Sequence, residues 1–246
     1  MTTTCLHVKS DNRISTLTLD NPSDNYLTKE ILSQLNMVVS EQLANNRELR
    51  AIVLTAKGRN FSAGIDYAGF VKMTKEEAGH YAEVGYSLLK HIENLPVPVI
   101  AALKGETIGA GLGLALAADI RIAASDAVFS FPEAQYGVPP IFGSTQRLAK
   151  TVGIGRAKEL FFTGRVIDAE EALRIGLINR IVPVDMLDEE TIRLANTIGN
   201  NSLSSLRSIK MLINYGLNEG YDIGLKEEVV AFSEAFNPDT DQWERL

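Results

Sequence analysis

The stretch that decides the fold spans residues 98–123 and reads PVIAALKGETIGAGLGLALAADIRIA. It opens with an apolar run that predicts a buried strand, passes through the glycine segment IGAGLGLA, continues as an apolar helix and ends in a second strand. A strand, a helix and a strand in this order favour parallel pairing through a crossover connection. This stretch therefore indicates an α/β fold.

The same alternation of strands and helices is present upstream. Residues 5–8 and 14–19 alternate apolar and polar side chains, as in a half-buried hairpin with Asp11 and Asn12 as its turn. Apolar positions at helical spacing predict a helix over residues 28–44. The other upstream elements expected are a strand over 51–55, a loop over 57–66 and a helix around 76–93.

Beyond Glu133 the pattern becomes almost entirely helical. We therefore divide the chain into a core at residues 1–190 and a helical region at residues 191–246, which would extend the core or dock on another subunit. The helices expected here span residues 143–152, 154–162, 168–175, 189–199, 202–215 and 221–236.

The composition is that of a soluble globular protein, with 45% apolar and 22% charged residues among 246. No apolar run is long enough to span a membrane, and the net charge of −7 argues against nucleic acid as a partner. A single cysteine and the lack of a recognisable targeting segment favour a reducing, cytoplasmic setting. The three histidines have no cysteine or carboxylate at ligand spacing, so we expect no metal site.

The glycine segment suits close contact between the backbone and a ligand. Gly109, Ala110 and Gly111 carry almost no side chain, and the helix that follows begins with N–H groups that have no acceptor within the helix. An anion or oxyanion fits at such a position, and glycines that merely let the helix pack closely are the alternative. The segment is not a phosphate loop, because no Gly-Lys-Ser/Thr follows it.

Three further motifs accompany the glycine segment. They are KGRNFSAGID at residues 57–66, FPEAQYGVP at residues 131–139 and GSTQRLA at residues 143–149. With these four motifs in order, the chain resembles the crotonase (enoyl-CoA hydratase/isomerase) superfamily over about residues 5–236. The resemblance implies a crotonase-like ββα spiral core with a helical C-terminal trimerisation region, assembled as a homotrimer or a hexamer made of two trimers.

The resemblance also implies a binding site for a coenzyme A thioester, which is the substrate rather than a permanently bound cofactor. The N–H groups of Ile65 and Ala110 would form an oxyanion hole. They would stabilise the enolate that forms when a proton leaves the carbon next to the thioester, by about 3 to 4 kcal/mol per donor. Lys57 and Arg59 would lie near the phosphates, with a solvated loop as the alternative. The other implied coenzyme A contacts are Ala63, Ile65 and Asp66 through backbone groups, and Phe236.

Hydratases of this family use two glutamates, and the chain keeps one of them. The position four residues after Gly109 is Gly113, which cannot act as acid or base, whereas Glu133 occupies the second position. Taken alone, a glutamate after proline suits the first turn of a helix, but beside two oxyanion donors it indicates a catalytic base. Ile141 stands where hydratases carry glycine, and the bulky Phe142 follows it. This part of the substrate pocket is therefore poorly built for water addition.

One carboxylate suffices to remove a proton from C2 and return it at C4. We therefore expect an enoyl-CoA isomerase that shifts a double bond from Δ3 to Δ2, with Glu133 as the shuttling base. Other members with a small residue at position 113 are hydratase/lyases and acyl-CoA hydrolases, and the hydrolases with glycine there add an aspartate where this chain has Ile141.

Two alternatives involve no catalysis. The loss of a glutamate at position 113 is also compatible with a catalytically inert protein that binds coenzyme A. One branch of the family binds RNA through a lysine-rich first helix, but Lys29 is the only basic residue over residues 28–42, so RNA binding is not expected.

Overall fold

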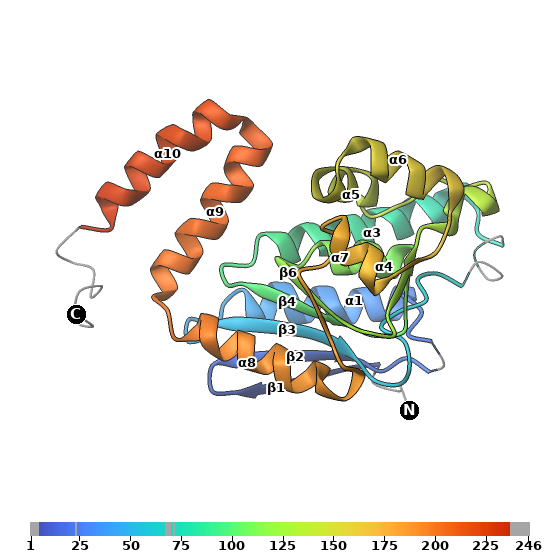
Figure 1. Ribbon diagram of the computed structural model, residues 1–246, viewed down its shortest axis with the longest axis horizontal. Coiled ribbons are helices and arrows are strands. Elements are labelled where there is room, and N and C mark those ends of the chain that lie inside the picture. Colours follow the sequence, from blue (N-terminus) through green and yellow to red (C-terminus); the bar gives the residue numbers. More distant parts are fainter. Residues whose placement is uncertain (1–4, 23, 67–69, 71, 237–246) are drawn as a thin grey trace.

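The computed structural model of the protein describes residues 5–22, 24–66, 70 and 72–236 (Figure 1). Its centre is a six-stranded sheet in which every neighbouring pair is parallel except the first. This confirms the α/β fold expected from the sequence. In spatial order the strands are β1 Leu6–Asp11, β2 Ile14–Leu19, β3 Ala51–Ala56, β4 Val99–Leu103, β6 Ile120–Ala124 and β9 Arg180–Val182.

The β1–β2 hairpin turns one residue later than expected. Asp11 pairs with Ile14, so Asn12 and Arg13 form the two-residue turn. Both have positive φ, 46° and 66°, which is the conformation that a tight hairpin turn requires and that asparagine adopts readily. The expected turn at Asp11 and Asn12 is therefore wrong by one residue.

Helices cover both faces of the sheet. On one face lies the large apolar core, and on the other α8 Leu187–Gly199 packs on β3 and β4. Both strands are buried along their whole length, as expected for a parallel sheet covered on two sides. The helices of the large core include α1 Lys29–Met37, its π-helical continuation η1 Val38–Leu43, α3 Lys75–Glu93 and α4 Ala110–Leu116.

The sequence did not predict the second sheet, which has three short strands. β5 Glu106–Ile108 pairs in parallel with β7 Val128–Ser130, which pairs antiparallel with β8 Ile167–Asp168. Strands of two or three residues show too little periodicity to stand out in a sequence. For the same reason, the two short strands β8 and β9 were not predicted beyond Glu133.

Helices nevertheless dominate the segment after Glu133, and none of the described helices is long and apolar enough to cross a membrane. α8 crosses the expected domain boundary at residue 190 and packs on the sheet. The other helices of this segment are η2 Pro132–Tyr136, α5 Ser144–Val152, α6 Ile154–Thr163, α7 Ala169–Arg174, η3 Val184–Met186, α9 Leu203–Glu219 and α10 Tyr221–Glu234.

The last two helices, α9 and α10, form a hairpin that extends away from the sheet (Figure 1). We call this hairpin the helical arm. A Cβ on Gly224 would lie 2.9 Å from the Cα of Gly216, so the two helices approach closely because both positions lack a side chain.

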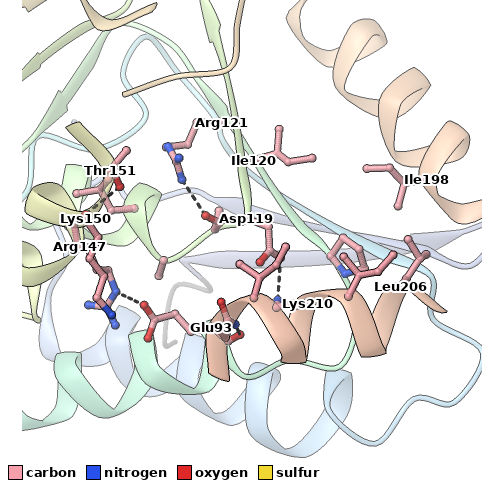
Figure 2. A pocket seen from close by; sticks show the side chains of 17 residues that line it. Glu93, Asp119, Ile120, Arg121, Arg147, Lys150, Thr151, Ile198, Leu206 and Lys210 are labelled. Carbon is pink, nitrogen blue, oxygen red and sulfur yellow. Dashed lines mark hydrogen bonds and ion pairs between the residues drawn. The ribbon is translucent and has the colours of Figure 1, made fainter. Parts of the chain in front are cut away.

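The arm is fastened to the rest of the chain beside a cavity of about 420 Å³ (Figure 2). The Lys210 ammonium donates to Asp119 at 2.7 Å and to the Val97 carbonyl at 3.1 Å. The Asn214 amide donates to the Glu93 carbonyl at 3.3 Å. Polar contacts therefore hold α9 at this side.

Candidate active site

Two segments that are distant in the sequence run side by side at the candidate site. Ser62, in the loop after β3, forms a parallel bridge with Thr107 in β5. The Ser62 N–H donates to the Glu106 carbonyl at 3.1 Å, and the Ile108 N–H donates to the Ser62 carbonyl at 3.0 Å. These bonds place the loop next to the start of α4.

Gly64 lies close against the backbone of the second segment. Its φ is +83°, and a Cβ there would lie 2.5 Å from the Ile108 carbonyl oxygen and 3.3 Å from the Ala110 nitrogen. Only glycine accepts both this conformation and this space. The residue that follows, Ile65, is therefore held close to Ala110.

The backbone donors of Ile65 and Ala110 are both enclosed. The two residues are 7% and 1% exposed. Ala110 is the first residue of α4, where an N–H has no acceptor within the helix. Within the described part of the chain, neither N–H donates a hydrogen bond. Two buried donors side by side suit an oxygen atom on which negative charge develops.

The small sheet brings Glu133 to the same place. β5 and β7 are in register with Ile108 opposite Ser130, and the Gly109 N–H donates to the Ser130 carbonyl at 2.9 Å. Glu133 follows β7 in the short helix η2 and is 2% exposed. The structure therefore gathers Glu133 and the two donor segments at one end of β5 and β7. A buried carboxylate beside such donors is well placed to act as a general base.

Gly113 lies one turn along α4 from Gly109, whose carbonyl accepts its N–H at 2.9 Å. A Cβ on Gly113 would lie 2.5 Å from the Oγ of Ser144. Ser144 is 1% exposed, and its Oγ donates to the Ile141 carbonyl at 2.7 Å. The space that a side chain at position 113 would enter is thus occupied by Ser144.

Ile141 and Phe142 occupy the turn before α5 and differ in exposure. Ile141 is half-buried at the edge of the large core, whereas Phe142 is 2% exposed. The Phe142 ring fills the space above Gly85 in α3 and lies 5.4 Å from the ring of Tyr81. Phe142 has a φ of +60°, which is unfavourable for an aromatic residue, and Arg147 donates to its carbonyl. Of the two residues, Ile141 keeps side-chain surface that a substrate could contact.

The residues expected to contact coenzyme A are spread more widely. The Ala63 N–H donates to the Asp24 carbonyl at 2.9 Å, and Arg59 and Asp66 are exposed within the same loop. Phe236 is 54% exposed and follows α10 in the helical arm, which extends away from the core (Figure 1). A single chain therefore does not gather Phe236 with the other candidate residues.

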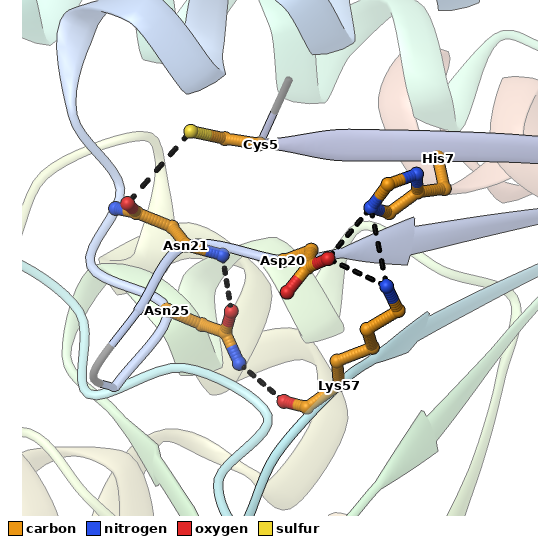
Figure 3. A network of polar contacts seen from close by, with 6 residues as sticks. All are labelled: Cys5, His7, Asp20, Asn21, Asn25 and Lys57. Atoms are coloured by element: carbon orange, nitrogen blue, oxygen red, sulfur yellow. Dashed lines mark hydrogen bonds and ion pairs between the residues drawn. The ribbon is translucent and has the colours of Figure 1, made fainter. Parts of the chain in front are cut away.

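Lys57 already has an acidic partner. Its ammonium donates to Asp20 at 2.6 Å and lies 3.3 Å from the ring of His7 (Figure 3). The hydrogen bonds from Lys57 and then His7 hold the pKa of Asp20 below its ordinary value. A coenzyme A phosphate would have to compete with Asp20 for the Lys57 charge.

The sequence profile of the enoyl-CoA hydratase/isomerase family matches residues 9–244. The chain belongs to this family. It is 36% identical over 232 residues to the short-chain-enoyl-CoA hydratase of Clostridium acetobutylicum, covering 94% of this chain and 88% of that protein. It is 34% identical over 231 residues to the crotonyl-CoA hydratase of Syntrophomonas wolfei, covering 93% and 88%.

Solved structures of the family have the same fold. The enoyl-CoA hydratase of Bacillus anthracis superposes with a TM-score of 0.90 at 34% identity, covering 93% of this chain and 90% of that one. Pseudomonas aeruginosa DspI superposes with a TM-score of 0.92 at 33% identity, covering 96% and 90%. The crotonase-type fold expected from the four motifs is thereby confirmed.

Asn25 organises the loop at residues 57–66, although the sequence analysis did not single it out. Its side-chain amide donates to the carbonyls of Lys57 and Asn60, both at 2.9 Å, and its own carbonyl accepts from the Ser62 hydroxyl at 2.7 Å (Figure 3 shows the Lys57 bond). Asn25 has a φ of +53°, a conformation in which asparagine is enriched. A lone asparagine in a loop has no spacing pattern, so this role could not be predicted.

Tyr26 is a second residue that the sequence analysis did not single out. Burial, followed by the carboxylates of Asp24, Asp66 and Glu106, raises the pKa of its phenol, which therefore stays neutral and able to donate a hydrogen bond. The N–H of its neighbour Leu27 donates to the Gly64 carbonyl at 2.8 Å, so Tyr26 lies next to the loop at residues 57–66. Among the residues described, no group of three or more His, Cys, Asp or Glu side chains could hold a metal ion.

Proposed function

We propose that the protein is an enoyl-CoA isomerase that moves a double bond from the Δ3 to the Δ2 position of an acyl-CoA. Glu133 is the only catalytic carboxylate in this proposal, and the N–H groups of Ile65 and Ala110 form the oxyanion hole. Ala63, Asp66, Lys57, Arg59 and Phe236 are assigned to coenzyme A, and Gly113 and Ile141 to the substrate pocket. Phe142, which the sequence also predicts there, is 2% exposed and packs against Gly85 and Tyr81 instead.

The observation that carries the proposal is the environment of Gly113. Hydratases of the family place a second glutamate at this position, whereas here the position has no side chain and the hydroxyl of Ser144 fills the adjacent space. A single buried carboxylate can transfer a proton between two carbon atoms, which is all that double-bond migration requires.

In the proposed reaction, Glu133 removes a proton from C2 of a 3-enoyl-CoA. The electron pair moves onto the thioester oxygen, which accepts hydrogen bonds from Ile65 and Ala110. The enolate then collapses, the double bond forms between C2 and C3, and Glu133 returns the proton to C4. Each oxyanion donor contributes about 3 to 4 kcal/mol to the stabilisation of the charged intermediate.

Three substrates distinguish the candidate reactions. The protein is incubated separately with a 3-enoyl-CoA, a 2-enoyl-CoA and a saturated acyl-CoA, and conjugation of the double bond, its hydration and release of free thiol are followed. We expect conjugation of the 3-enoyl-CoA as the dominant reaction. Dominant hydration of the 2-enoyl-CoA would contradict the proposal.

The role of Glu133 is tested by Glu133→Gln, which keeps the side-chain shape and removes the base. We expect isomerisation to fall by about 10²- to 10⁴-fold with the melting temperature little changed. Glu170→Gln, on the exposed surface of α7, is the matched control and keeps full activity. A Glu133→Gln variant as active as the wild type would remove Glu133 from the mechanism.

Hydration is the second candidate, because the two curated relatives compared above are named as enoyl-CoA hydratases. In that case Glu133 alone would activate the water. Hydrolase, hydratase/lyase and inert coenzyme A-binding functions are further alternatives. Thiol release supports a hydrolase, and binding of acyl-CoA without exchange of the C2 proton with solvent supports an inert protein.

The helical region at residues 191–246 supports a proposal on assembly. We assign it to contacts between copies of the chain, as a homotrimer or a dimer of trimers, because α9 has no buried residue and α10 exposes large apolar side chains. An apolar helix face of this kind is stable in water when another surface covers it. We also propose a reducing, cytoplasmic setting, which the single cysteine favours.

A further inference from the structure

Ser144 lies where a side chain at position 113 would begin. A Cβ on Gly113 would be 2.5 Å from the Ser144 Oγ and 3.8 Å from the Ser144 Cβ. The first distance is shorter than any real contact of a Cβ atom, whereas the second is an ordinary van der Waals contact. The hydroxyl oxygen alone therefore creates the conflict.

The Ser144 hydroxyl is not free to turn away without loss. It donates to the Ile141 carbonyl at 2.7 Å, and Ser144 is 1% exposed, so a rotated hydroxyl would lose this bond inside the protein. The Ser144 N–H donates to the same carbonyl at 3.1 Å.

The turn that carries Ser144 is also held in place. The Phe142 ring is enclosed above Gly85, and Arg147, which donates to the Phe142 carbonyl, is ion-paired with Glu93 at 2.6 Å. The backbone of the turn therefore cannot retreat from α4 without breaking these contacts.

We propose that Ser144 is a specificity-determining residue, whose hydroxyl keeps position 113 without a side chain and so limits the site to the single carboxylate of Glu133. The inference rests on the proposed isomerase function for its catalytic meaning. Its steric part, a coupling between positions 113 and 144, is independent of which reaction the enzyme performs.

A stability cycle tests the coupling. Melting temperatures are measured at one protein concentration for the wild type, Gly113→Ala, Ser144→Gly and the double variant. We expect Gly113→Ala to lower the melting temperature by about 3 to 8 °C in the wild-type background and to leave it unchanged or raise it in the Ser144→Gly background. Gly79→Ala, at a helical glycine with nothing within 4 Å of its Cβ, gives the effect of the substitution without a clash. An equal effect of Gly113→Ala in both backgrounds would overturn the proposal.

A gain of function tests the catalytic consequence. Gly113→Glu is compared with Gly113→Glu/Ser144→Gly for hydration of a 2-enoyl-CoA. We expect the double variant to fold and to hydrate at least about 10-fold faster than Gly113→Glu, because a correctly placed general acid–base group contributes about 10²- to 10⁴-fold. A Gly113→Glu variant that folds and hydrates as fast as the double variant contradicts the role of Ser144, as does a folded double variant with no gain.

The two proposals fail in different ways. A wild-type enzyme that mainly hydrates would contradict the isomerase function and leave the stability cycle unaffected. A wild-type enzyme that isomerises but shows no coupling between positions 113 and 144 would contradict only the role of Ser144.

Discussion

The core of the molecule and its helical arm bury apolar side chains to very different extents. In the core, every residue of β3 and β4 is buried, and helices close both faces of the sheet. In the arm, α9 has no buried residue, and Val229 and Phe232 of α10 are 71% and 69% exposed. Both regions have helices with apolar faces, but only the core covers them within one chain.

This difference separates two sources of stability. Burial of a large apolar side chain contributes about 1.5 to 3 kcal/mol, and the core gains this for most of its apolar residues when a single chain folds. The arm gains it only when another surface covers α9 and α10. A single chain therefore brings Glu133 and the two donor segments together but leaves the apolar surface of its arm uncovered.

Acidic substitutions on the apolar surface of the arm should have the largest effect. We expect Val229→Asp/Phe232→Asp to convert the proposed trimer into monomers, because burying two carboxylates costs more free energy than the contact between subunits contributes. Light scattering after size exclusion measures the mass, and circular dichroism checks that the core remains folded. Val184→Asp, at a half-exposed position on η3, is the control and should leave the assembly intact. An unchanged mass for the double variant would place the subunit contacts elsewhere.

Two glycines in one helix test how tightly the core is packed. A Cβ on Gly85 of α3 would lie 2.0 Å from the Phe142 ring, whereas nothing lies within 4 Å of a Cβ on Gly79. We expect Gly85→Ala to lower the free energy of unfolding by about 2 to 3 kcal/mol through overpacking. Gly79→Ala should raise it by about 0.5 to 1 kcal/mol through helix propensity. Denaturant unfolding measures both, and effects of the same sign would contradict the packing described here.

The smallest expected effect concerns the fastening of the arm. Lys210 is 9% exposed and ion-paired with Asp119, which also accepts from the Val99 N–H at 2.7 Å. We expect Lys210→Met to lower stability by about 1 kcal/mol and to speed hydrogen exchange in α9 before any change in β3 or β4. Lys226→Met, at an exposed position of α10, is the control with no expected change. Faster exchange throughout the core would show that the arm and the core unfold together.

Sequence patterns predicted the long elements and missed the short ones. The apolar run at residues 51–55 and the helical spacing at residues 76–93 correspond to β3 and α3. The strands β5, β7 and β8 have only two or three residues each, so their pairing depends on neighbours that are far away in the sequence. These unpredicted strands are the ones that align Ile108 with Ser130 and so bring Glu133 to the segments that carry Ile65 and Ala110.

The candidate site likewise contains residues that local motifs predict and contacts that they do not predict. Glu133, Ile65 and Ala110 could be named from motifs because each motif is local. Lys57 was assigned to coenzyme A by its place in a motif, but its partner Asp20 is supplied by another strand end, which no local pattern contains.

By itself, the sequence determined the family and the parallel arrangement of the long strands. It also showed that only one of the two positions where hydratases carry a glutamate has one here. Motifs and periodicity reveal these features because they are properties of neighbouring residues. Only the tertiary structure decided that Gly64 touches the Ala110 backbone and that the Ser144 hydroxyl fills the space beside Gly113. It also decided that the arm leaves its apolar surface uncovered. Such contacts depend on distances of a few ångströms between segments that are far apart along the chain, and close packing determines them.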